Sequence, residues 1–206
     1  YDRMVQSTNP SFWVQADLRA SGRAKAAHIV ANTKFGDTLV MLKGSPTDPN
    51  APTIYHGQMD VLESLYASGE RVLGYENWTQ GWDPAVARRS MDQALTKLNN
   101  NVQGVVSSND GNAGAAVAAL AEQGMAGNVP VSGLDCTVQA LQLILLDQMT
   151  QSVWRDFDMM AEATAKATVA LINEDSLDGI VMGTSQANSA GKEVPMVPVG
   201  FYNAVG

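Results

Sequence analysis

Cysteine is almost absent from this sequence, which has one, Cys136, in 206 residues. A single cysteine excludes an internal disulfide and argues against a zinc site built from thiolates. Basic residues are also few, with 13 Lys and Arg against 21 Asp and Glu and a net charge of −8. That balance argues against nucleic acid and against an anionic membrane surface as partners, because both attract positive proteins. No apolar run reaches the length of a membrane span.

Signatures of catalysis and of phosphate binding are missing as well. No GxGxxG or GxxxxGK[ST] motif follows any expected strand, so we expect no nucleotide cofactor. The two histidines, His28 and His56, have no partner at metal-ligand spacing, and we expect both to be structural and no metal to bind. No nucleophile is paired with a base. An enzyme that acts on a sugar through acidic groups such as Asp48, Asp110 and Asp135 is a low-ranked alternative.

Apolar residues make up 45% of the chain and charged residues 17%, which is typical of a folded core in one large or two small domains. Short apolar, β-branched runs alternate with helical patterns. We expect strands at 38–43, 71–75, 102–106, 129–132 and 149–153, helices at 20–32, 51–68, 84–98, 112–123, 137–146 and 156–173, and an edge strand at 196–199 in the tail. This alternation predicts an α/β fold with a parallel sheet flanked by helices on both faces.

Polar and aromatic residues follow the carboxyl end of each expected strand. In strand order they include Asp48 and Asn50, then Trp82, then Asn109 and Asp110, then Asp135, and last Arg155. In open α/β sheets, ligands bind in the crevice outside the carboxyl ends of the strands. The coincidence over five strands, more than any one residue, predicts a binding site there.

The chemistry of this set suits a neutral polyol. Carboxylates accept hydrogen bonds, amides donate and accept, and a guanidinium donates, so together they match hydroxyl groups. The broad apolar face of Trp82 suits the C–H face of a sugar ring. The alternative stays open that Asp48, Asn109 and Asp135 are helix N-caps and that Trp82 is a packing residue.

Several segments are similar to those of a known family. They are Tyr1-Asp2-Arg3-Met4, Gly44-Ser45-Pro46-x-Asp48-x-Asn50-Ala51, Gly57-Gln58-Met59, Trp78-x-x-Gly81-Trp82, Ser108-Asn109-Asp110, Ser132-Gly133-x-Asp135 and Val194-Pro195. On these segments, the chain resembles the periplasmic sugar-binding proteins of ABC transporters of the ribose/xylose type, from Tyr1 to about residue 203. The resemblance implies a type I periplasmic-binding-protein fold, in which two lobes close on a sugar.

The resemblance also assigns sugar ligands, residue by residue. The residues that match the family's ligands are Asp2 and Arg3 from the first lobe, Asp48 and Asn50 from the second lobe, Trp82 as the stacking aromatic, and Asn109 and Asp135 as hydroxyl ligands. Arg155 stands where xylose-type members have a lysine, and we include it among the ligands. Because a planar guanidinium presents its donors differently from an ammonium, the identity of the sugar stays open. We expect Asp110 to cap the following helix rather than to bind sugar.

Family members carry a further segment before the Asp-Arg motif, and we therefore expect part of the first lobe to be missing from this chain. The resemblance predicts a first-lobe remnant at 1–16, the second, sugar-binding lobe at 17–155, a segment returning to the first lobe at 156–183 and a C-terminal strand or tail at 184–206. One face of the helix at 156–173 should then be exposed, and a second copy of the chain could cover it as a homodimer.

The function implied is capture of a pentose such as xylose for an ABC permease, outside the cytoplasm and without catalysis. Two alternatives stay open. The same fold could serve as the sugar-sensing domain of a regulator or of a membrane sensor, since fold does not separate transport from sensing. The chain could also be a fragment that does not bind sugar.

Overall fold

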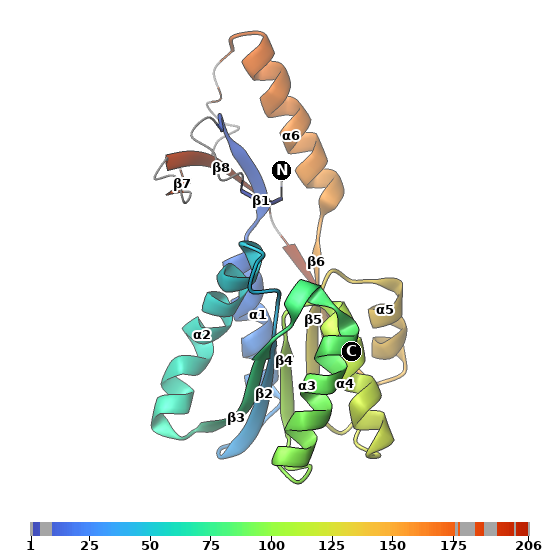
Figure 1. The fold of residues 1–206 in the computed structure, drawn as a ribbon. Helices are drawn as coiled ribbons and strands as arrows, with labels where there is room; N and C mark the ends of the chain where they lie inside the picture. The colour runs from blue at the N-terminus through green and yellow to red at the C-terminus, as the bar shows by residue number, and fades with distance from the viewer. Residues whose placement is uncertain are drawn as a thin grey trace. The chain divides into compact units, whose positions relative to one another are not determined.

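The structure is a computed structural model that describes residues 2–4, 10–175 and 177, together with the backbone of the strands at 184–187, 193–199 and 201–205. The chain divides into two compact units (Figure 1). Unit 1 comprises Tyr1–Asp17 and Arg155–Tyr202, and unit 2 comprises Leu18–Trp154 and Asn203–Gly206. The assignment of segments to the lobes of a sugar-binding protein stays a prediction.

A parallel sheet forms the centre of unit 2. Its strands, in order across the sheet, are β3 (Arg71–Trp78), β2 (Asp37–Lys43), β4 (Gly104–Ser107), β5 (Val131–Leu134), β6 (Gln151–Arg155) and β9 (Phe201–Val205). The pairs from β3 to β6 are all parallel. The predicted alternation of strands and helices and the predicted parallel sheet are therefore confirmed.

Helices cover both faces of this sheet, as Figure 1 shows. On one side are α1 (Leu18–Ala31) and α2 (Asn50–Ser68), and on the other are α3 (Pro84–Lys97), α4 (Asp110–Glu122) and α5 (Val138–Leu145). Strand β2 explains the arrangement, because its side chains alternate between two apolar clusters. Leu39 and Met41 pack with α1 and α2, whereas Val40 and Leu42 pack with α3 and α4. A strand with four consecutive apolar residues, as at 39–42, presents apolar side chains to both faces of the sheet and needs cover on both.

The described residues of unit 1 form a small sheet and one helix. Strand β8 (Glu193–Val199) lies between β1 (Trp13–Ala16), to which it is parallel, and β7 (Thr184–Ala187), to which it is antiparallel. The strand expected at 196–199 forms the second half of β8, which lies between two strands in the sheet order, although Met196 is the one residue of that segment for which a pair with β7 is described. The partners of β8 lie far away in sequence or in the tail itself, where local pattern gives no register.

Helix α6 (Phe157–Ile172) packs on strand β1 of unit 1 through Met160, which is fully buried beside Val14. Other apolar side chains of the same helix are exposed, among them Val169 at 55% and Ile172 at 74%. The predicted exposed apolar face of this helix is thus present. Within the described residues, none of the helices is long and apolar enough to cross a membrane.

Several boundaries differ from the sequence expectation, and the reasons are local. Helix α4 begins at Asp110 instead of residue 112, because Asn109 takes the capping position. Strand β3 continues to Trp78, and β6 continues to Arg155, so both strands reach further toward the carboxyl edge than expected.

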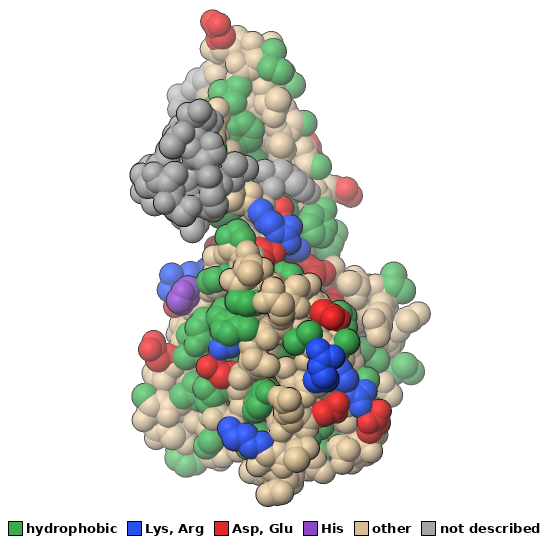
Figure 2. All heavy atoms as spheres, viewed as in Figure 1, with side chains coloured by type: hydrophobic (Ala, Val, Ile, Leu, Met, Phe, Trp, Pro, Cys, Tyr) green, Lys and Arg blue, Asp and Glu red, His purple; other side chains and the backbone are tan. Residues whose placement is uncertain are grey.

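Figure 2 shows acidic and basic side chains interspersed on the visible face of unit 2, with no extended basic patch there.

Candidate functional site

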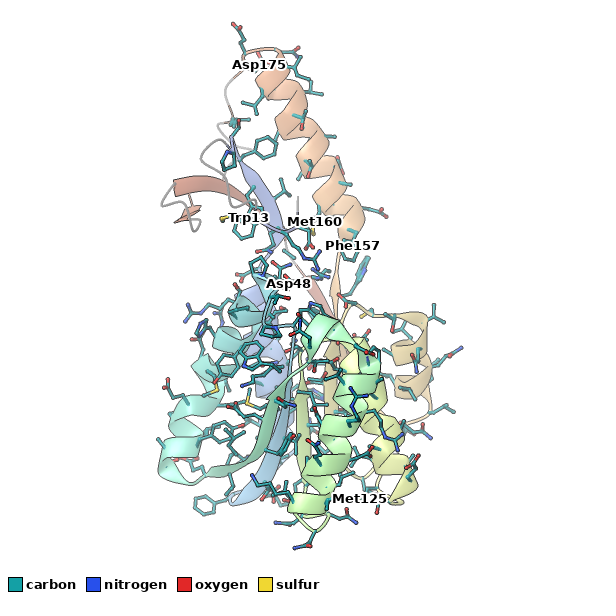
Figure 3. All side chains as sticks on the ribbon, in the orientation of Figure 1. Trp13, Asp48, Met125, Phe157, Met160 and Asp175 are labelled. Carbon is teal, nitrogen blue, oxygen red and sulfur yellow. The ribbon has the colours of Figure 1, made fainter. Side chains whose placement is uncertain are left out.

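The carboxyl ends of β3, β2, β4 and β5 meet at one edge of unit 2. Figure 3 shows Asp48 at this edge and Met125 at the opposite one. The loops that leave the four strands carry five of the eight predicted ligands, namely Asp48, Asn50, Trp82, Asn109 and Asp135. The structure therefore brings these five residues to one edge, while Asp2, Arg3 and Arg155 belong to unit 1.

Asp48 and Trp82 form a hydrogen-bonded pair, although they follow different strands. The Trp82 Nε1–H donates to Asp48 Oδ2 at 3.0 Å. The other carboxylate oxygen, Oδ1, accepts from the backbone N–H of Asn50 at 2.9 Å, in the first turn of α2. Asp48 and Asn50 are both buried, and Trp82 is half-buried. The carboxylate thus fixes the orientation of the indole ring.

The loop that carries Trp82 is held in an unusual backbone conformation. Gly81 and Trp82 both have positive φ, 66° and 57°, which for tryptophan is strained. Ser45 Oγ accepts a hydrogen bond from the Gly81 backbone N–H at 3.1 Å and ties the loop to the segment after β2. The indole ring also packs against Gly44, where a Cβ atom would come within 2.1 Å of Trp82 Cη2. The position of the ring therefore depends on three separate contacts.

The structure gives the capping role expected of Asp110 to Asn109, while the sugar contact expected of Asn109 stays a prediction. Asn109 Oδ1 accepts from the backbone N–H of Asn112 at 3.0 Å, so Asn109 is the N-cap of α4. Asp110 was expected to be that cap, and this was wrong. Its buried carboxylate instead accepts from Ser152 Oγ at 2.7 Å and from the Thr137 backbone N–H at 2.8 Å. Burial raises the pKa of Asp110, and those two hydrogen bonds oppose the rise.

Asp135 lies in a strained turn directly after β5. Its φ is 110° and that of Cys136 is 50°, and both values are rare for residues with a side chain. The backbone N–H of Asp135 donates to the carbonyl oxygen of Val153 at 2.8 Å, which continues the pairing of β5 with β6. A strained turn persists where its surroundings hold it, and such turns cluster at functional sites.

In unit 1, the carboxylate of Asp2 lies between two arginines. Arg155 Nη1 donates to Asp2 Oδ1 at 3.0 Å, and both side chains are 14% exposed. Arg3 Nη1 donates to Asp2 Oδ2 at 3.2 Å, and its side chain is 58% exposed. The carbonyl oxygen of Asp2 accepts from Gln15 Nε2 at 2.6 Å. The three predicted ligands from unit 1 therefore form one polar cluster.

Asn112 is a structural residue of the site that sequence reasoning missed. It is fully buried, and its Nδ2 donates to the Lys43 carbonyl oxygen at 3.2 Å and to Thr79 Oγ1 at 3.1 Å. It thereby links the first turn of α4 to the ends of β2 and β3. An asparagine in the first turn of a helix gives no sequence signal that separates this role from simple helix capping.

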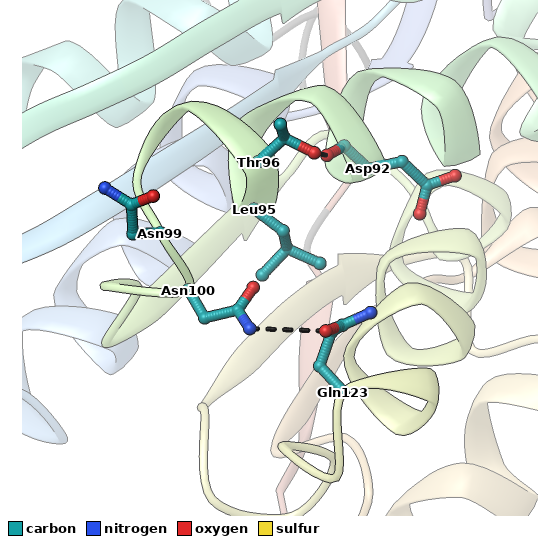
Figure 4. Close-up of a pocket in the computed structure, with 6 residues that line it drawn as sticks. All are labelled: Asp92, Leu95, Thr96, Asn99, Asn100 and Gln123. Atoms are coloured by element: carbon teal, nitrogen blue, oxygen red, sulfur yellow. Dashed lines mark hydrogen bonds between the residues drawn. The ribbon is translucent and has the colours of Figure 1, made fainter.

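A shallow depression of about 640 Å³ lies at the other edge of unit 2 (Figure 4). It is lined by Asp92, Leu95, Thr96, Asn99, Asn100 and Gln123. Asn100 Nδ2 donates to Gln123 Oε1 at 3.2 Å across it. It lies where α3 ends, at the amino edge of the sheet, and none of the predicted ligands lines it. We therefore place the candidate site at the carboxyl edge.

The carboxyl edge of unit 2 offers carboxylate and amide oxygens, amide N–H groups and an indole face. These groups recognise hydroxyls and the apolar face of a ring, in keeping with a small neutral polar ligand. Among the described residues, no group of three or more His, Cys, Asp or Glu is arranged to hold a metal ion. The indole ring and the Asp48 carboxylate are held by the protein before any ligand binds.

A parallel sheet covered on both faces, with polar and aromatic loops at its carboxyl edge, defines an α/β ligand-binding unit. The chain belongs to the periplasmic binding protein domain family, which matches residues 1–176. The resemblance seen in the sequence motifs is thereby confirmed.

The chain is similar to two curated D-xylose-binding periplasmic proteins. It is 34% identical to the protein of Haemophilus influenzae over 195 residues, which cover 95% of this chain and 57% of that protein. It is 35% identical to the Escherichia coli protein over 173 residues, which cover 84% of this chain and 52% of that protein. The chain therefore spans little more than half the length of these relatives.

The fold of the chain is also similar to that of solved solute-binding proteins. An ABC transporter solute-binding protein from Clostridium phytofermentans, solved with β-D-glucose, matches with a TM-score of 0.86 at 24% identity. The match covers 100% of this chain and 67% of that one. This likeness establishes the type I periplasmic-binding-protein fold.

Proposed function

We propose that this chain is the sugar-binding part of a solute-binding protein, which captures a monosaccharide for uptake through an ABC transporter and carries out no catalysis. One observation carries the proposal. Loops from four adjacent parallel strands bring two carboxylates, two amides and an indole to the same edge of unit 2. This combination fits sugar hydroxyls and a sugar ring, and it lacks the charge that would select a phosphate.

The proposed ligands are the eight residues that match the family's motifs. They are Asp48, Asn50, Trp82, Asn109 and Asp135 from unit 2, and Asp2, Arg3 and Arg155 from unit 1. The contact between the Trp82 Nε1 and the Asp48 carboxylate supports the proposal, because it holds the ring that would stack on the sugar. A protein side chain that is already oriented before binding loses less conformational entropy when the sugar binds.

The proposed ligand is a pentose such as D-xylose. The names of the two curated relatives support this choice. Arg155 stands where xylose-type members have a lysine, and a guanidinium fixes the direction of its donors more strictly than an ammonium does. The two side chains would therefore select for different arrangements of sugar hydroxyls. We accordingly propose a test with a panel of sugars that includes both pentoses and hexoses.

The proposed partner is an ABC permease or a membrane sensor, and the proposed location is outside the cytoplasm, either in the periplasm or as a cell-surface lipoprotein. The periplasmic names of the relatives and the family of the chain support the location. The partner would be met through the surface of the protein and not through the lipid bilayer.

The proposal is tested by titrating the intrinsic tryptophan fluorescence of the protein with D-xylose, D-ribose, L-arabinose, D-glucose and D-fructose. The Trp82 ring should respond to a bound sugar, so we expect saturable binding of one sugar. A well-folded protein that responds to none of them, with calorimetry agreeing, would refute the proposed function and favour a fragment that does not bind.

Two variants test the residues. Asn109→Ser keeps a good N-cap for α4 but withdraws the amide, and Asp135→Asn removes the charge while keeping a residue that tolerates positive φ. Each should raise the Kd at least about tenfold, as expected from the loss of one hydrogen bond to a charged or oriented group. Unchanged affinity in both variants would remove these residues from the site.

A further inference from the structure

Asp110 is a buried acidic residue that the proposed sugar contacts leave unexplained. The residue is 3% exposed and lies in the first turn of α4, beside the loop that carries Asp135. Gly133 makes room for it, because a Cβ atom on that glycine would come within 2.2 Å of Asp110 Oδ1. A carboxylate is costly to bury, so its position calls for a specific reason.

The hydrogen bonds of Asp110 point to that reason. Three consecutive backbone N–H groups of the turn after β5 are each held by a different acceptor. The Asp135 N–H donates to the Val153 carbonyl oxygen at 2.8 Å. The Cys136 N–H donates to Ser152 Oγ at 3.0 Å, and the Thr137 N–H donates to Asp110 Oδ2 at 2.8 Å.

Ser152 connects the last two of these contacts. Its hydroxyl accepts from the Cys136 N–H and donates to Asp110 Oδ1 at 2.7 Å, and its side chain is fully buried in β6. One carboxylate therefore orients the serine hydroxyl and also binds the next amide of the turn. The turn needs such support, since the φ values of Asp135 and Cys136 are 110° and 50°. Each residue held in this way costs about 1–3 kcal/mol, and the surrounding contacts must offset it.

We propose that Asp110 is a positioning residue for sugar recognition, which acts through Ser152 and the Cys136–Thr137 backbone to hold Asp135 in the geometry that meets a sugar hydroxyl. The inference rests on the proposed function, because it takes Asp135 as a ligand. Asp110 itself does not contact the sugar. It holds the strained turn in one conformation and so fixes the position of the Asp135 carboxylate as a hydrogen-bond acceptor. Without Asp110, the turn would relax and the Asp135 carboxylate would move away from that position.

The single cysteine of the chain allows a test that does not need sugar. Cys136 lies inside the turn and is half-buried, and burial raises the pKa of its thiol, which slows its reaction with a disulfide reagent such as DTNB. Release of the turn should expose the thiol. The rate of DTNB reaction in the native protein therefore reports the order of the turn directly.

The variants are Ser152→Ala, Asp110→Ala, Asp110→Asn as the conservative change, and Thr150→Val as a matched control. Thr150 Oγ1 accepts from the Val131 N–H at 3.2 Å and donates to the Val131 carbonyl oxygen at 3.0 Å, so its replacement removes two hydrogen bonds between the same strands at the opposite end. Ser152→Ala is the decisive variant, because it keeps the Asp110 carboxylate and thus separates loss of geometry from loss of charge.

We expect Ser152→Ala and Asp110→Ala to react with DTNB at least about tenfold faster and to bind D-xylose, or whichever sugar of the panel the parent binds, with a Kd about tenfold to a hundredfold higher. Asp110→Asn should stay nearer the parent in both measurements, since an amide can still bond to the Thr137 N–H and to Ser152 Oγ. Thr150→Val should change neither measurement by more than about twofold, because its lost hydrogen bonds lie away from the turn.

Three results would overturn the proposal. The first is a DTNB rate in Ser152→Ala equal to that of the parent. The second is an equal acceleration in Thr150→Val, which would mean general loosening. The third is a faster thiol with unchanged sugar affinity, which would mean that the turn does not govern recognition. If the parent binds no sugar, the proposed function fails and the positioning role fails with it, while the DTNB rates still decide whether Asp110 holds the turn.

Discussion

A single methyl group added at Gly44 should strongly disturb the candidate site. In Gly44→Ala the new Cβ would lie 2.1 Å from Trp82 Cη2, 2.5 Å from Cζ3 and 2.7 Å from the Cβ of Ala51. Carbon atoms in ordinary contact are about 3.5–4.0 Å apart, so the ring must move by more than about 1 Å. It cannot do so without loosening its 3.0 Å hydrogen bond to Asp48. Overpacking of this kind costs about 1–3 kcal/mol, and the weakened hydrogen bond adds to it.

We therefore expect Gly44→Ala to lower the free energy of unfolding of unit 2 by about 2–4 kcal/mol, as measured by urea denaturation followed by circular dichroism. The native fluorescence of Trp82 should change, and sugar affinity should fall. Gly111→Ala is the matched control, because its Cβ would meet nothing closer than 3.4 Å, at Pro84. In helix α4 that change should be neutral or stabilise by up to about 1 kcal/mol.

A double-mutant cycle with Trp82→Ala isolates the ring's share of this cost. The cost of Gly44→Ala should shrink when the ring is absent, but it should not vanish, because the contact with Ala51 remains. Equal costs of Gly44→Ala in the presence and absence of the ring would refute the reasoning. So would an unchanged urea midpoint together with an unchanged emission spectrum.

Two further predictions concern other parts of the chain. Burial lowers the pKa of His28 below its usual 6.5, so the unfolded chain takes up the proton first as the pH falls. The contribution of neutral His28 to stability is complete above pH 6.5 and is lost at lower pH. We expect His28→Gln to flatten this part of the profile of unfolding free energy against pH, as measured by urea titrations at several pH values. A profile that matches the parent would contradict this. In unit 1, Asp2→Asn should cost about 1–3 kcal/mol, because it removes the charge from a largely buried ion pair with Arg155. Arg3→Ala, at a side chain that is 58% exposed, should cost less than about 1 kcal/mol, and equal losses would argue against the difference in burial as the cause.

The sheet of unit 2 could be predicted from sequence because its signal is local. The run at 38–43 has four consecutive apolar residues, at 39–42, and is followed by turn residues, which is typical of a strand buried on both faces. Crossover connections between such strands make them parallel, and parallel strands end at one edge. The grouping of Asp48, Trp82, Asn109 and Asp135 at that edge followed from this rule.

The contacts within the site could not be predicted in the same way. Asn109 and Asp110 are adjacent and both are good caps, and the choice between them depends on Ser152, which follows Asp110 by 42 residues. The pair of Trp82 with Asp48 joins two loops that are 34 residues apart. The central place of β8 likewise depends on pairing with β1, almost the whole chain away. Local patterns contain no information about these partners.

Contacts with the protein and sugar binding are not competing roles for Asp48 and Asn109 at this edge. Both oxygens of the Asp48 carboxylate accept hydrogen bonds from the protein, and because a carboxylate has about four lone-pair sites, such contacts are compatible with a bond from a sugar hydroxyl. Asn109 uses Oδ1 for the cap, while its Nδ2 group would supply donors to a sugar. The contact to the backbone fixes the rotamer, and a fixed rotamer reduces the entropy lost on binding. The contacts of Asp48 and Asn109 with the protein are thus the means by which the proposed site would be rigid before the sugar arrives.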